Sequence, residues 1–141
     1  GARDRCDETV FRFRTVRDAR YRYIRNFTPE RPFLQPNAYK EKQYPVLALI
    51  KELGAEGKLT DWQKNFYLAP TMPTEELYDM NADPHSMKNL VDSKSKEHRD
   101  ALVRLRKALE TWIEDSNDQG KTLEPKALAA AMGYAKPENI K

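Results

Sequence analysis

Hydrophobic and polar residues alternate near the start of the chain. Phe11 and Phe13 alternate with arginines, and after a short interruption Tyr21 and Tyr23 alternate with arginines again. Side chains two positions apart in a strand share a face, so this pattern predicts a β-hairpin with one aromatic face and one arginine face. An isolated hairpin is marginal in water, and we therefore expect a further strand, best placed at residues 76–80, and a covering helix.

Apolar residues at helical spacing follow later in the chain. Pro45 suits a first helical turn and Gly54 a helix end, while Thr60 is a good cap for a second short helix. The four prolines between residues 27 and 45 predict an extended connection there, because proline disrupts helices and donates no ladder hydrogen bond.

The longest predicted helix spans about residues 94–115, with Asp92 or Ser93 as its cap. Its apolar positions recur at spacings of three and four, which is typical of a helix that covers a sheet with one face. The expected stripe consists of Leu102, Leu105, Leu109 and Trp112, with Ala101, Ala108 and Ile113 beside it.

The composition indicates a folded chain with a small core. A length of 141 residues suits a single domain, and Leu, Ile, Val and Phe make up 27 of those residues. The net charge of only +3 and the nine Trp and Tyr residues argue against disorder. We therefore expect that the chain packs against another surface. No apolar run has the length of a membrane helix, and no signal-like region opens the chain.

Few residues offer catalytic or metal-binding chemistry. The single cysteine, Cys6, excludes an internal disulfide, and it lies far in sequence from the two histidines, His85 and His98. We expect His85 in a turn and His98 on a solvated helix face, rather than as metal ligands. The five glycines have no phosphate-loop spacing.

Arginine is concentrated in residues 1–31, which hold nine arginines, no lysine and five acids. The hairpin arginines and rings fit either a nucleic-acid platform or a solvated face over an aromatic core. The run Arg3–Glu8 (RDRCDE) fits either a salt-bridged loop or a site for a sulfated or carboxylated ligand.

Two long runs of sequence resemble the C-terminal region of type I sulfatases, nearest to the bacterial heparan N-sulfatase-like (sulfamidase-like) branch. The first comprises Arg3–Glu8, Arg14–Phe27 and Pro29–Phe33. The second comprises Glu75–His85 and Asn89–Leu90, and is similar to the family pattern E-L-Y-D-L-x-x-D-P-x-E-x-x-N-L, with a serine after His85 in place of the last glutamate. The resemblance covers about residues 3–118.

The resemblance implies an α+β fold, with a small antiparallel β-sheet of about four strands packed by a long C-terminal helix. Residues 1–118 would form this sulfatase C-terminal subdomain, and residues 119–141 a weakly structured tail. The formylglycine and Ca²⁺ of the family would belong to a missing N-terminal domain, so we expect no cofactor in this chain. Cys6 cannot supply the formylglycine, because Glu8 and Val10 stand where the family motif has Pro and Arg.

The function implied is hydrolysis of sulfate esters or sulfamates of carbohydrates by the whole enzyme, with this chain inactive alone. Its partners would be the N-terminal domain and the sulfated carbohydrate, without nucleic acid or membrane, in a periplasmic or secreted protein. Arg3, Asp4 and Arg5 are our candidate substrate-binding residues at the pocket rim, although they could equally brace the domain interface. The alternative function is an autonomous Arg-rich binding module for nucleic acid or anionic polysaccharide.

Overall fold

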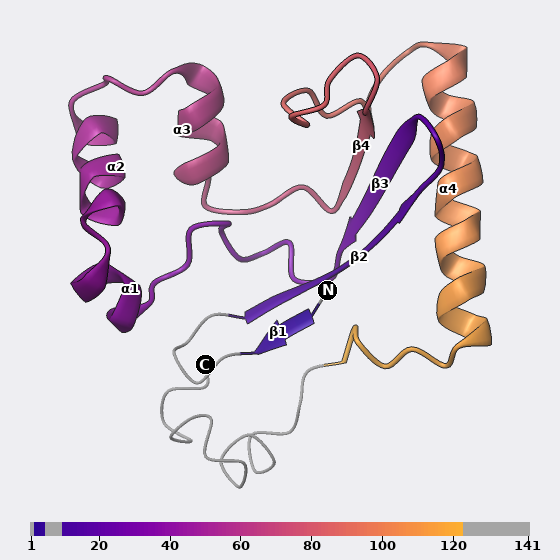
Figure 1. Cartoon of the computed structure of the whole chain (residues 1–141), viewed down its shortest axis with the longest axis horizontal. Helices are drawn as coiled ribbons and strands as arrows, with labels where there is room; N and C mark the ends of the chain where they lie inside the picture. The colour runs from indigo at the N-terminus through magenta and orange to yellow at the C-terminus, as the bar shows by residue number, and fades with distance from the viewer. Residues whose placement is uncertain (1, 5–9, 123–141) are drawn as a thin grey trace, which may run out of the picture. The chain divides into compact units, whose positions relative to one another are not determined.

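The computed structural model describes residues 2–4 and 10–122 of the chain (Figure 1). In these residues the strands form one sheet with the order β1-β2-β3-β4, in which β3 is antiparallel to both β2 and β4. The predicted α+β class, with a sheet of about four strands and a long C-terminal helix, is confirmed. The elements are β1 (Ala2–Asp4), β2 (Val10–Arg17), β3 (Tyr21–Asn26), α1 (Ala38–Gln43), α2 (Pro45–Ala55), α3 (Asp61–Tyr67), β4 (Glu75–Asp79) and α4 (Lys96–Asp115).

The chain divides into two compact units. The described part of the first comprises Ala2, Arg12–Phe27 and Pro73–Thr122, and holds most of the sheet together with α4. The described part of the second comprises residues 3–4, 10–11 and Thr28–Met72, and holds α1, α2 and α3.

The core of the first unit lies between the sheet and α4. Tyr23 pairs with Leu77 across β3 and β4, and both side chains are almost fully buried. Figure 1 shows α4 running beside the β2–β3 hairpin. Each fully buried side chain of this size contributes about 1.5–3 kcal/mol. The buried hydrophobic residues that form this cluster are Tyr21, Tyr23, Leu77, Ala101, Leu102, Leu105 and Leu109.

The predicted stripe on α4 is correct except at Ala108, which is exposed, and at Trp112. Leu102, Leu105 and Leu109 are buried as expected, and Ile113 packs at the edge of the cluster. Trp112, however, keeps 51% of its surface exposed. It lies beyond Leu109, the last buried residue, in a turn where Ile113 rather than Trp112 packs against the cluster.

The expected division of the hairpin into an aromatic face and an arginine face is wrong. Val16 pairs with Tyr23, and Phe13 pairs with Asn26. Paired residues share a face of the sheet, so Tyr21 and Tyr23 lie on the face of Val16, and Phe13 lies on the other. At the turn, Arg17 pairs with Arg22. Each odd-numbered residue of β2 therefore pairs with an even-numbered residue of β3.

Local capping explains the helices of the second unit. Thr60 caps α3 as predicted. Its hydroxyl accepts a hydrogen bond from the backbone amide of Gln63, and the Gln63 side chain accepts one from the backbone amide of Thr60. The extended connection predicted for residues 27–45 is interrupted by α1. Pro36 is followed by no further proline before Pro45, and the Asn37 side chain accepts a 2.8 Å hydrogen bond from the amide of Lys40.

Two predicted helix boundaries move by a few residues. Gly54 lies inside α2, which ends at Ala55, and it is Gly57 that takes a positive φ of 69°. The N-cap of α4 is Ser95 rather than Asp92 or Ser93. None of the described helices is long and apolar enough to cross a membrane.

Candidate functional site

A hollow of about 550 Å³ lies in the first unit, where the β2–β3 turn meets α4. Its lining is strongly charged, with two arginines and three carboxylates, and the rest of the lining comes from the turn and from one helix residue. The lining residues are Asp18, Ala19, Arg20, Tyr21, Glu97, Asp100, Ala101 and Arg104.

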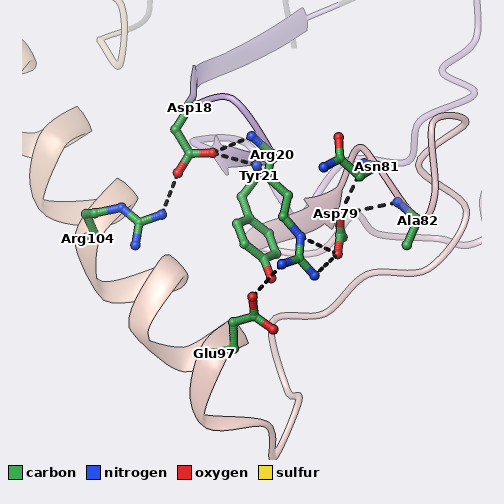
Figure 2. A network of polar contacts seen from close by, with 8 residues as sticks. All are labelled: Asp18, Arg20, Tyr21, Asp79, Asn81, Ala82, Glu97 and Arg104. Carbon is green, nitrogen blue, oxygen red and sulfur yellow. Dashed lines mark hydrogen bonds and ion pairs between the residues drawn. The ribbon is translucent and has the colours of Figure 1, made fainter.

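Arg20 joins the strand after the turn to both β4 and α4 (Figure 2). Its Nε and Nη2 donate to Oδ2 of Asp79 at 2.9 and 2.7 Å, and its Nη1 donates to Glu97. The Asp79 carboxylate is buried, and the hydrogen bond from Arg20 lowers its pKa below the usual value. The Arg20 guanidinium also lies 4.9 Å from the centre of the Tyr21 ring, within the range of a cation–π contact.

Asp18 fixes the turn itself. One of its carboxylate oxygens accepts hydrogen bonds from the backbone amides of Arg20 and Tyr21, at 2.8 and 2.6 Å. The other accepts from Arg104 of α4. The Tyr21 amide, together with Arg104, lowers the pKa of Asp18 to about 2. The carboxylate is therefore ionised at neutral pH and fastens the turn to the helix.

Glu75 forms a second ionic centre at the start of β4. Arg106 of α4 binds it in the bidentate manner, with Nε to Oε1 at 2.8 Å and Nη2 to Oε2 at 2.9 Å. The Tyr23 hydroxyl donates to the same carboxylate, and Arg25 lies 3.3 Å away. The bond from Arg106 is the main reason that the pKa of Glu75 is lowered.

Asp79 and Asn89 also satisfy backbone groups that follow β4 or lie at its edge. Oδ1 of Asp79 accepts from the amides of Asn81 and Ala82, at 3.1 and 3.3 Å (Figure 2). Oδ1 of Asn89 accepts from the amide of Leu77 at 3.0 Å, and its Nδ2 donates to the carbonyl of Glu75 at 3.1 Å. These polar residues of the second signature therefore hold the fold in place.

Among the described residues, no group of three or more His, Cys, Asp or Glu side chains could hold a metal ion. His85 is exposed in a turn, as predicted. His98 departs from its predicted solvated position, because its Nδ1 lies 2.7 Å from the Ser93 hydroxyl and its ring meets Tyr21 edge-on at 6.1 Å.

The predicted substrate-binding residues lie at the N-terminal edge of the described chain. The backbone of Arg3 and Asp4 forms part of β1, and Arg5 lies outside the described residues. Among the described residues, the structure pairs Arg20 with Asp79 and Arg106 with Glu75, and sequence reasoning proposed neither pair. Both carboxylates lie in the second signature, Asp79 at the end of its E-L-Y-D run (Glu76–Asp79) and Glu75 just before that run, but the signature does not indicate which arginines bind them.

No family model matches the chain. The chain is 36% identical over 127 residues, or 90% of its length, to an ulvan-active sulfatase of Formosa agariphila. The matched stretch is 21% of that protein, so the chain spans about a fifth of the length of its curated relative. The chain is therefore homologous to one region of a sulfatase, which supports the resemblance seen in the sequence. The finer assignment to the sulfamidase-like branch stays a prediction.

Acid should weaken the joint between sheet and helix. The folded pKa values of Asp18, Asp79 and Glu75 lie below their ordinary values, so their stabilising contribution is full above about pH 5 and is lost as the pH falls toward and through the folded pKa. We expect the thermal midpoint of unfolding to drop between about pH 5 and pH 2. Asp79→Asn should lower the midpoint at pH 7 and flatten this drop.

Asp115→Asn is the matched control, because the Asp115 side chain is exposed at the end of α4. Melts followed by circular dichroism at several pH values compare the three proteins. Equal midpoints at pH 7 for the wild type and Asp79→Asn, with parallel declines in acid, would contradict the structural role of this carboxylate.

Proposed function

We propose that the chain is the C-terminal region of a type I sulfatase that hydrolyses sulfate esters or sulfamates of carbohydrates. The observation that carries the proposal is the 36% identity to a sulfatase over 90% of the chain. The contacts of Glu75, Asp79 and Asn89 support it, since they give the second sulfatase-like signature a structural task. By the same resemblance, we propose that the whole protein is periplasmic or secreted.

Catalysis would then depend on residues outside this chain. The described residues do not fit the Ca²⁺ site of such an enzyme, because Asp18, Asp79 and Glu75 are already held by arginines and no suitable cluster of ligands exists among them. Cys6 lies outside the described residues, and its sequence context does not match the formylglycine motif. The proposed role of this region is to support the catalytic part and to shape the rim of its pocket.

The ion pairs do not favour the alternative of an Arg-rich binding module. A nucleic-acid platform needs guanidinium groups that are free to neutralise phosphates. Several arginines of the hairpin are instead held by acids of their own unit, at distances of 2.7–3.3 Å where Arg14 meets Asp118, Arg20 meets Asp79 and Arg25 meets Glu75. Binding to DNA at two salt concentrations would still detect such a module through a steep loss of affinity with salt.

The chain alone should release no sulfate. The purified chain and the protein encoded by its complete reading frame are compared on 4-nitrophenyl sulfate and on sulfated polysaccharides, with inorganic sulfate measured by ion chromatography. The complete protein should release sulfate and the chain should not, because its sequence lacks the formylglycine motif and its described residues hold no metal-binding group of three or more His, Cys, Asp or Glu. Release by the chain alone, or a complete protein without sulfatase activity, would contradict the proposal.

Arg3 and Arg5 are proposed to bind the anionic substrate at the pocket rim, with Asp4 between them. If a guanidinium binds substrate and transition state equally, its removal raises KM and leaves kcat unchanged. Arg3→Ala and Arg5→Ala in the complete enzyme should therefore raise KM several-fold, with a KM closer to the wild-type value in Arg3→Lys. A lower thermal midpoint with unchanged KM would assign these residues to bracing the interface instead.

A further inference from the structure

The second unit has an unusual distribution of polar and apolar side chains. In its described part, the buried residues are Thr28, Gln35 and Asn37, which are all polar. Neither α2 nor α3 has a buried residue, although α2 carries a dense set of apolar side chains. Large apolar residues of this unit that remain exposed are Phe33, Tyr39, Tyr44, Val46, Leu49 and Phe66.

Four of these exposed residues lie on α1, on α2 or at Tyr44 between the two helices. Val46 and Leu49 are separated by three positions and so lie on one side of α2, with 53% and 48% of their surfaces exposed. The rings of Tyr39 and Tyr44 meet edge-on at 6.1 Å, and both are at least half exposed. We call Tyr39, Tyr44, Val46 and Leu49 the α1–α2 face.

A different side of α2 is already occupied. A Cβ added to Gly54 would lie 2.3 Å from a methyl carbon of Leu68 and 3.5 Å from one of Leu59, so the helix is in close contact with the segment around α3 on that side. Gly54 and Val46 are eight positions apart, which turns them about 80° from each other around the helix. The α1–α2 face therefore has no cover from this contact.

The charges near the α1–α2 face suit a protein partner. Lys51 and Glu41 are joined by an ion pair of 2.8 Å, which leaves no excess charge from these two residues for an anionic ligand. Tyrosine and large aliphatic side chains are typical of the centre of protein interfaces, where lysine and glutamate are depleted. An apolar face that a monomer leaves open marks an interaction surface.

We propose that the α1–α2 face is the surface on which the rest of the sulfatase polypeptide docks. This inference rests on the proposed function. The matched stretch is 21% of the curated relative, so about four-fifths of such an enzyme lies outside a chain of this kind. A large neighbour within the same polypeptide would cover the apolar side chains that the second unit cannot bury by itself.

Cysteine labelling tests the docking surface without a severe change to the fold. Leu49→Cys and Ala48→Cys are made in a Cys6→Ser background, in the chain and in the protein of the complete reading frame. Ala48 is the matched control, because it is exposed on the opposite side of α2 from Val46. The rate of maleimide labelling is read from the α2 peptide by mass spectrometry.

In the chain alone, both cysteines should label at rates within about three-fold of each other. In the complete protein, the cysteine at position 49 should label at least tenfold more slowly than the cysteine at position 48. Leu49→Glu should in addition lower the thermal midpoint of the complete protein by several degrees, while Ala48→Glu leaves it nearly unchanged. Equal labelling of the two positions in the complete protein would overturn the inference.

Protection of position 49 in the chain alone would overturn it as well, since another part of the chain or a second copy would then cover the face. Size-exclusion chromatography separates these two cases, because Leu49→Glu would convert a dimer of the chain to a monomer. Sulfate release by the complete protein is measured in parallel. An active complete protein with an unprotected position 49 would refute the docking surface alone, whereas a protected position 49 without sulfatase activity would refute the proposed function alone.

Discussion

The first unit depends on one joint, the contact between the sheet and α4. Tyr23 and Leu77 are almost fully buried beneath Leu105 and its neighbours, and this apolar contact is the main favourable term. Hydrophobic contact alone does not fix how a helix lies along a sheet. The direction is fixed by carboxylates of the strands and turn that bind arginines of α4, Glu75 to Arg106 and Asp18 to Arg104.

The same joint explains why the polar residues of β4 are not available for chemistry. Asp79 binds Arg20 and two turn amides at once, and the arginine lowers its pKa, so it remains an ionised acceptor. A general acid or base needs a pKa near the working pH and a free path to the substrate. Asp18, Glu75 and Asp79 have lowered pKa values and bind arginines, which suits a role in holding the fold together.

Much of the fold follows from local patterns in the sequence. Alternation predicted the hairpin, spacing of three and four predicted α4, and Thr60 predicted the start of α3, because each signal acts over a few residues. The prediction of one aromatic face and one arginine face was wrong, because the turn sets which residues of β2 and β3 share a face of the sheet. The helix α1 was missed because prolines dominate the segment, although the Asn37 cap is a local signal that could have revealed it.

The ion pairs could not be predicted in the same way. Glu75 and Arg106 are 31 positions apart, and Arg14 and Asp118 are 104 apart, so only the folded sheet and helix bring them together. The candidate site residues Arg3, Asp4 and Arg5 came from the charge pattern of Arg3–Glu8 and from the resemblance. Alternating charges fit a salt-bridged loop as well as an anion site, and for that reason the sequence suggested these residues without fixing their task.

Glu75 of β4 ties the sheet to α4 through its bidentate pair with Arg106. A double-mutant cycle of Glu75→Gln and Arg106→Leu, measured by urea unfolding, tests it most directly. Because the pair is bidentate and partly shielded from solvent, the account predicts a coupling free energy on the order of 1 kcal/mol. Additive effects of the two substitutions, within about 0.3 kcal/mol, would contradict it.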